Sequence, residues 1–246
     1  MISPHPWLEH LRLHLEVARL GRDPEGVHQM RVALRRLGAW LDLGGWRVLV
    51  DDIGWLRRNA GAVRDFDVLF ERHPKEPLGP WLARRRERAR GALLAALDAP
   101  RAAGLLEALS LAPPLDPDRA RTALEGLARR VATRGKRAVE SAEKPKEIER
   151  WHALRRALRR LRYGMEWLEM PTKPLRELQD ELGELGDLAV LQRQLREYPE
   201  PGHVAEIAAQ LEQATERALV AARTGWRERH EAVLAAVPRT RPWTSS

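Results

Sequence analysis

The sequence predicts an all-α fold made of two related helical bundles. Nearly every long segment repeats its apolar residues with the helical period, and no run of alternating β-branched and polar residues is long enough for a sheet. Proline and glycine clusters separate these segments. The pattern of the first half also recurs in the second. We therefore expect two bundles of about four to five helices each, related by a pseudo-twofold axis.

Helices are expected between the proline and glycine clusters, of which GRDPEG, APPLDPD and MPTKP are examples. The clearest start signal is Asp23-Pro24-Glu25, where a capping carboxylate precedes a proline suited to the first helical position and an early acid. The expected helices cover about residues 6–20, 24–43, 46–62, 65–73, 78–98, 100–111, 117–140, 146–169, 174–198 and 202–236.

An internal repeat links the two halves. His28 and His152 are 124 residues apart, and they begin the similar basic segments HQMRVALRRLGAWL and HALRRALRRLRYGMEWL. The following segments also match, because Asp65 and Asp187 are 122 residues apart in WLRRNAGAVRDFDVL and ELQDELGELGDLAVL. Two matches in the same order and at nearly the same displacement indicate a duplicated bundle.

The composition favours a soluble, folded protein with an anionic partner. The chain has 246 residues, 43% of them hydrophobic, and a net charge of +8. It is arginine-rich, with 38 arginines against five lysines. Arginine grips two phosphate oxygens at once, which points to a phosphate-rich partner, although a GC-rich genome explains the surplus equally well.

Several classes of function are not supported. The chain has no cysteine, which excludes disulfides, thiolate metal sites and a cysteine nucleophile. It has no signal peptide and no apolar run of about 18 residues, so we expect a cytoplasmic protein without a membrane partner. A GxxxxGK phosphate loop, a nucleophile elbow and paired carboxylates are also missing. We expect no enzyme activity, no catalytic residues and no cofactor.

Helical placement separates an apolar stripe from a basic face in both copies. We call His28, Arg31 and Arg35 the first His/Arg face, because they cluster within roughly 60° of one another. The second His/Arg face consists of His152, Arg155, Arg159 and Arg162. The apolar stripes are Val27, Met30, Leu34, Leu37 and Leu41 in the first copy, and Trp151, Leu154, Leu158, Leu161 and Met165 in the second.

The arginines of both helices need negative charge nearby, because like charges three or four residues apart destabilise a helix. Acids of neighbouring helices could provide it, and we expect this for Arg36 and Arg160, which lean away from the histidines. For the His/Arg faces themselves, the recurrence of the pattern favours an external polyanion. The candidate acids are Asp65, Asp67, Asp180 and Asp187.

The two histidines admit several roles. A nearby phosphate would favour the protonated form, which donates from both ring nitrogens. The alternatives are a structural histidine, a metal ligand or a phosphoacceptor. A metal is poorly supported, because the neighbours of His28 and His152 are arginines and no ligand spacing is present. His10 and His14 are four residues apart but lack an obvious third ligand. We expect no metal site.

The paired segments VHQMRVALRRLGAWL with LRRNAGAVRDFDVL, and WHALRRALRRLRYGMEWL with LRELQDELGELGDLAVL, resemble the two halves of a CHAD domain, the conserved histidine α-helical domain. The resemblance covers essentially the whole chain. It implies a single domain over residues 1–246, with halves at 1–112 and 113–246 and a basic channel or surface between them. It also implies binding of inorganic polyphosphate, with phosphate or sulfate ions as its equivalents in a crystal.

The resemblance further implies a set of binding residues. The principal ones are His28, Arg31, Arg35, Arg36, His152, Arg155, Arg156, Arg159, Arg160, Arg162 and Tyr163. Arg57, Arg58 and Arg64 are expected as secondary contributors.

The chain departs from the family pattern in two places, and it lacks the hydrolase to which related chains often attach this domain. Gly38 stands where the pattern usually has a basic residue, and Arg64-Asp65 becomes Gly186-Asp187 in the second half. The Glu-x-Glu-x-Lys motif of the hydrolase has only an imperfect match at residues 147–151, without the lysine.

Two rival functions stay open. RNA or DNA could stack on some of the nine tryptophans, but Trp40, Trp151 and Trp167 fall at or beside apolar stripes, so we expect them in the core. Nucleic acid is therefore the less favoured partner. A basic scaffold module that docks acidic proteins is the other rival. Polyphosphate binding would also be compatible with association with polyphosphate granules, while chain-length preference and oligomeric state stay open.

Overall fold

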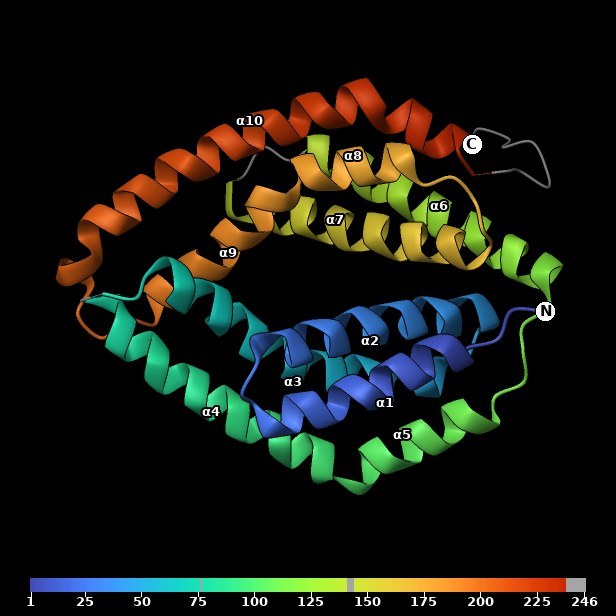
Figure 1. The fold of residues 1–246 in the computed structure, drawn as a ribbon. Helices are drawn as coiled ribbons and strands as arrows, with labels where there is room; N and C mark the ends of the chain where they lie inside the picture. The colour runs from blue at the N-terminus through green and yellow to red at the C-terminus, as the bar shows by residue number, and fades with distance from the viewer. Residues whose placement is uncertain (76, 141–143, 238–246) are drawn as a thin grey trace. The chain divides into compact units, whose positions relative to one another are not determined.

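The computed structural model describes residues 1–75, 77–140 and 144–237, and it confirms the all-α class (Figure 1). Glu76 and Glu143, in two predicted turns, lie outside the described residues. The helices are α1 (His5–Leu20), α2 (Pro24–Gly44), α3 (Arg47–Arg72), α4 (Leu78–Asp98), α5 (Pro100–Leu111), α6 (Pro117–Val139), α7 (Lys144–Trp167), α8 (Lys173–Glu181), α9 (Gly183–Arg196), the 3₁₀ helix η1 (Pro201–Val204) and α10 (Ala205–Ala235). In the described ranges, no helix is long and apolar enough to cross a membrane.

The chain divides into two compact units. The first covers Met1–Asp116, and the second begins at Pro117. The division falls within the proline-rich segment APPLDPD, where the backbone leaves helical geometry between α5 and α6. Each unit has its own buried apolar residues, so each is described separately below.

In the first unit, α1 to α4 pack against one another in chain order, and α5 contacts α1, α3 and α4 (Figure 1). The start of α2 follows the predicted capping pattern, because the Asp23 side chain accepts a hydrogen bond from the backbone N–H of Glu25 at 2.8 Å. All five residues of the predicted α2 stripe are buried, as expected. Trp40 is also in the core, where its indole N–H donates to the Ile2 carbonyl at 3.0 Å.

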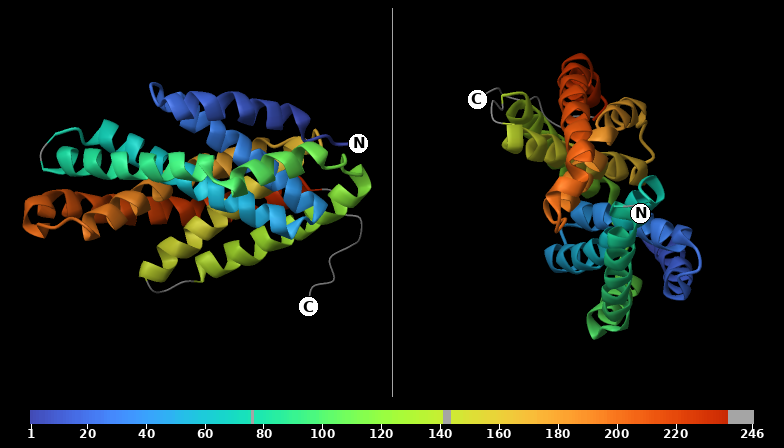
Figure 2. Two further views of the ribbon diagram at one scale, coloured as in Figure 1. Left: turned by 90° about the horizontal axis from the view of Figure 1, so that it is seen from below. Right: turned by 90° about the vertical axis from the view of Figure 1, so that its left-hand side faces the viewer.

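In the second unit, α6 packs beside α7, α7 contacts α8 and α9, and α10 runs along α6, α8 and α9 (Figure 2). The predicted α7 stripe is confirmed, since all five of its residues are fully buried. Glu147 of α7, from the imperfect hydrolase motif, is buried and accepts two hydrogen bonds from Arg223 of α10 at 2.8 and 2.7 Å. This carboxylate therefore ties α7 to α10.

Two helix predictions were wrong. The expected helices at 46–62 and 65–73 form one continuous α3, because Gly61 alone does not end a helix and the buried residues Ala60, Val63 and Phe66 keep the apolar period across the expected gap. The expected helix at 174–198 is instead interrupted at Leu182, between α8 and α9. Glycines at 183 and 186 weaken the helix there, and neighbouring helices supply contacts on both sides of the break.

Candidate functional site

The first His/Arg face lies on α2, and α3 passes beside it. The guanidinium of Arg31 donates to the carbonyl of Gly61 at 3.1 Å and lies 3.3 Å from the Asp65 carboxylate. The Arg31 side chain is only 14% exposed. One arginine of the predicted set is therefore held by α3 through a carboxylate and a backbone carbonyl.

His28 shows which other charges gather at this face. Burial lowers its pKa most, Glu25 raises it, and the positive charges of Arg64, Arg35 and Arg31 lower it further. The structure thus brings Arg64 of α3, predicted as a secondary contributor, together with the three α2 residues of the face. The lowered pKa favours the neutral form of His28.

The remaining predicted residues of the first half lie differently. The guanidinium of Arg36 stacks over the ring of Trp7 at 4.2 Å, which directs it toward α1. Arg57 is half-buried and Arg58 is exposed on α3, and neither is among the charges that shift the pKa of His28. Arg57 lies seven residues before Arg64 and therefore on the same side of α3, whereas Arg58 lies six residues before it, about 120° round the helix.

The second His/Arg face lies on α7, against α9. Arg155 extends over Gly186, where an added Cβ would lie 3.1 Å from a terminal guanidinium nitrogen. Glycine therefore makes room for this side chain. Burial lowers the pKa of Arg155, while Asp187 and Asp180 act in the opposite direction. The Nε atom of Arg155 is buried without a hydrogen-bond partner among the residues that the structure describes.

His152 has the most strongly shifted pKa at this face. Burial lowers its pKa from 6.5 to about 4, and Arg156, Arg155, Arg159 and Arg193 contribute in the same direction. Its Nδ1 atom is also buried, with no hydrogen-bond partner within the described part of the chain. At pH 7 the ring is therefore neutral. The positive charge around it comes from the arginines alone.

The sequence did not predict a role for Arg193 of α9, whose positive charge lowers the pKa of His152. The internal repeat offered no signal, because the corresponding residue of the first half is Glu71. The helical spacing did contain a signal. Arg193 follows Gly186 by seven residues, so both residues lie on the same side of α9.

The other α7 residues of the predicted set point in other directions. Arg162 lies along its own helix, 3.7 Å from Glu166, with its guanidinium 4.8 Å from the centre of the buried Tyr163 ring. Arg156 and Arg160 lie near Arg134 of α6, because both lower the pKa of that guanidinium. Arg156 also lowers the pKa of His152, so it lies between His152 and Arg134.

The geometry suits anion binding. In residues 1–75, 77–140 and 144–237 no group of three or more histidine, cysteine, aspartate or glutamate side chains is placed to hold a metal ion. His10 and His14 stack with ring centres 4.4 Å apart, and His10 hydrogen-bonds to Gln29 at 3.1 Å. Guanidinium groups around a neutral histidine can instead donate several hydrogen bonds to phosphoryl or sulfuryl oxygens.

Comparisons with known proteins agree with this fold. The family model for the CHAD domain matches residues 6–196. A CHAD domain from the plant Ricinus communis is 27% identical over 95% of this chain and 88% of its own, with a TM-score of 0.66. PptA from Streptomyces chartreusis, 19% identical, is similar in fold over 92% of this chain and 100% of its own, with a TM-score of 0.66. The search of curated proteins found no match.

Proposed function

This chain belongs to the CHAD domain family, and on that premise we propose that it binds inorganic polyphosphate without catalysing its turnover. The observation that carries the proposal is the environment of Arg155 and His152. Both groups are partly buried among further arginines, and burial together with positive charge lowers the pKa of His152 to about 4. A bound polyanion would add to the negative charge that Asp187 and Asp180 place near Arg155.

Arginine is suited to a phosphate chain. Its planar guanidinium forms two parallel hydrogen bonds to one phosphoryl group, and such charge-assisted bonds are roughly twice as strong as neutral ones. On each face two arginines four residues apart, Arg31 with Arg35 and Arg155 with Arg159, are separated by about 6 Å along the helix. Neighbouring guanidinium groups can therefore engage different phosphoryl groups of the same chain.

The presence of a similar face in each unit supports a long ligand. The cluster of the first unit consists of His28, Arg31, Arg35 and Arg64, and that of the second consists of His152, Arg155, Arg156, Arg159 and Arg193. A protein that binds in this way would follow its ligand in the cell, including to polyphosphate granules in the cytoplasm. Its role there is recognition, because the faces contain no carboxylate cage for the metal that phosphoryl transfer generally needs.

Titration with long-chain polyphosphate at several salt concentrations tests the proposal. Arg155→Gln combined with Arg159→Gln should weaken binding and reduce the dependence of log affinity on log salt, because fewer phosphates are contacted. The matched control is Arg121→Gln with Arg217→Gln, which removes two exposed charges of the same unit. Equal losses in both variants would contradict a specific site.

A competition experiment separates polyphosphate from nucleic acid. Single-stranded RNA is added to the polyphosphate complex at equal phosphate concentration. Trp40 and Trp151 are fully buried and are not available to stack on bases, so RNA should displace little of the bound polyphosphate. Displacement at equal phosphate concentration would refute the specificity for polyphosphate.

A further inference from the structure

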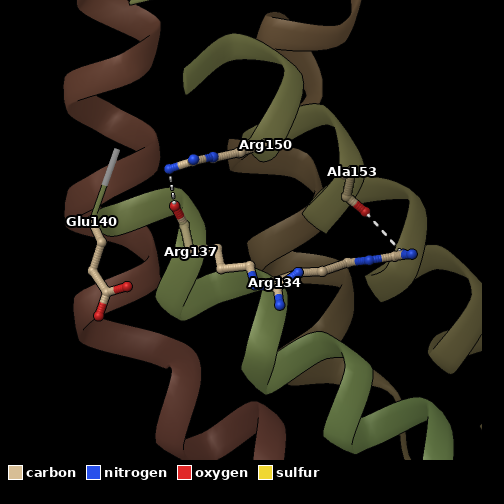
Figure 3. A pocket seen from close by; sticks show the side chains of 5 residues that line it. All are labelled: Arg134, Arg137, Glu140, Arg150 and Ala153. Atoms are coloured by element: carbon tan, nitrogen blue, oxygen red, sulfur yellow. Dashed lines mark hydrogen bonds between the residues drawn. The ribbon is translucent and has the colours of Figure 1, made fainter. Parts of the chain in front are cut away.

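A basic pocket lies between the end of α6 and the first turns of α7. It has a volume of 540 Å³ and is lined by Arg134, Arg137, Glu140, Arg150 and Ala153 (Figure 3). All of these residues belong to the second unit. None of them is part of the second His/Arg face. We call this feature the α6–α7 pocket.

The α6–α7 pocket and the second His/Arg face lie on different sides of α7. At about 100° per residue, Arg150, Ala153, Arg156 and Arg160 share one side of the helix, and the second His/Arg face is centred roughly 130° away from it. The apolar stripe occupies a third side and is fully buried. One helix therefore presents arginines in two separate directions.

Backbone carbonyls hold two of the pocket's guanidinium groups in place. Arg134 of α6 reaches across to the carbonyl of Ala153 on α7 at 3.4 Å, and Arg150 of α7 reaches back to the carbonyl of Arg137 on α6 at 3.1 Å (Figure 3). Each contact uses one of the five N–H donors of an arginine. The other donors stay available, and the reciprocal contacts fix where they lie.

The pocket has more positive than negative charge. Burial lowers the pKa of Arg134, and the charges of Arg156, Arg160, Arg130 and Arg137 lower it further. Glu140 is the single carboxylate among the described lining residues, and it lies 4.0 Å from Lys136. In Figure 3 its carboxylate points to the opposite side of the pocket from the Arg134 guanidinium.

We propose that the α6–α7 pocket is a second anion site, which binds a short phosphate-bearing anion of two or three phosphoryl groups, such as pyrophosphate or tripolyphosphate. Three arginines from two helices line one cavity, which suits a ligand with several anionic oxygens better than a single carboxylate. Its volume is within the range of small-molecule sites, roughly 300–1,000 Å³. Arg156 extends the positive charge toward His152, so the two sites adjoin.

This inference does not depend on the proposed function, because different residues carry it. The test therefore begins from the full-length Arg155→Gln/Arg159→Gln protein, in which the second His/Arg face is impaired. Tripolyphosphate binding to this protein is measured by isothermal titration calorimetry. We expect this protein to bind tripolyphosphate still, at the α6–α7 pocket and with a stoichiometry of one. Loss of all tripolyphosphate binding in this background would overturn the inference.

The decisive variant adds Arg134→Gln and Arg137→Gln to that background. Tripolyphosphate affinity should fall at least tenfold, while Arg121→Gln with Arg217→Gln, which removes the same charge, should change it less than threefold. Equal effects of the two pairs would overturn the proposal. Arg137 is exposed, so Arg137→Gln alone gives a variant that keeps its fold, and it should still weaken binding several-fold. Long-chain polyphosphate titrations report separately on the function proposed above.

Discussion

The two His/Arg faces carry the same sequence motif, but the arginine that the neighbouring helix adds stands at a different position in each. In the first unit α2 supplies Arg31 and Arg35, and α3 adds Arg64. In the second unit α7 supplies all the arginines of the face, and α9 adds Arg193. Both units therefore have a cluster of positive charge, but the arginine from the second helix stands at a different position of the matching segments, 64 in α3 and 193 in α9.

Two glycines stand where the other half has an arginine. In the repeat, Gly38 of α2 corresponds to Arg162 of α7, and Arg64 of α3 corresponds to Gly186 of α9. Gly38 is buried, and an added Cβ would lie in ordinary contact with Ile53 at 3.5 Å, so a basic side chain at this position would start from the buried surface between α2 and α3. Gly186 lies beneath Arg155, where an added Cβ would be only 3.1 Å from the guanidinium. Of the two glycines, Gly186 is therefore the one that marks a close approach.

The two faces also differ in how far their charge is already neutralised. Arg31 lies 3.3 Å from Asp65. Asp187 and Asp180 act on the charge of Arg155, but burial still lowers the pKa of this guanidinium, and its Nε atom is buried with no hydrogen-bond partner in the described ranges. The pKa of His152 falls to about 4, and that of His28 is lowered by fewer arginines. The second face should therefore gain more from a bound anion than the first.

The largest test of this difference compares paired arginine changes. Arg155→Gln/Arg159→Gln should weaken long-chain polyphosphate binding about a hundredfold, because two charge-assisted contacts at about 1.5 kcal/mol or more each are lost. Arg31→Gln/Arg35→Gln should weaken it about tenfold, because Arg31 is already paired with Asp65. Titration at one salt concentration measures both. Equal losses would show that the faces contribute alike.

Removing the acid of the first face should make the two faces more similar. Asp65→Asn frees the Arg31 guanidinium for the ligand, and polyphosphate affinity should rise about threefold to tenfold. The same change should lower the free energy of unfolding by about 1 kcal/mol, since the Arg31–Asp65 pair is partly shielded from water. Asp98→Asn, which removes an exposed carboxylate paired with Arg19 in the same unit, is the matched control, and denaturant unfolding gives the stability. Unchanged affinity in Asp65→Asn would contradict the role assigned to this pair.

The histidines should make binding depend on pH. A bound phosphate raises the pKa of His152 from about 4 toward its ordinary value of 6.5, so lowering the pH from 7 to 5 should strengthen polyphosphate binding several-fold. His152→Gln should remove most of this dependence, and His28→Gln less. Titration at each pH, with NMR of the ring protons, tests the expectation. A His152 pKa that stays near 4 in the complex would contradict it.

The same histidine should affect stability in the absence of ligand. Its pKa is about 4 in the folded protein and ordinarily 6.5, so the unfolded chain binds more protons between these values. The free energy of unfolding should therefore fall as the pH drops from 6.5 to 4. In His152→Gln this decrease should be smaller, as chemical denaturation at each pH would show. A His203→Gln control, at an exposed position, should retain the full decrease.

The smallest expected effects come from two glycines of the helices behind the faces. A Cβ at Gly186 would lie 3.1 Å from Arg155, so Gly186→Ala should displace that guanidinium slightly and weaken binding twofold to threefold. At Gly61 the added Cβ would meet nothing within 4 Å, so Gly61→Ala should leave binding unchanged. It should also raise the free energy of unfolding by about 0.5–1 kcal/mol, because alanine favours the helix. Calorimetry and thermal unfolding measure both effects.

The amino-acid sequence by itself determined the helices, their apolar stripes and the repeated basic motif. These features depend on local properties, namely the helical period, the capping residues and the side-chain volumes of one segment. All ten stripe residues of α2 and α7 are buried as predicted. Local rules were insufficient where a helix is stabilised or interrupted by its neighbours, as at Gly61 in α3 and Leu182 between α8 and α9.

Only the tertiary structure decided which charges stand together. Arg36 lies on Trp7, Arg31 is held by Asp65, and Arg193 lowers the pKa of His152. Helical spacing turned Arg36 away from His28, but it did not identify any of these three partners. The α6–α7 pocket likewise needs arginines from two helices. A charge interacts over several ångströms with whatever packing brings near it, so its partner depends on contacts between helices and not on its own segment.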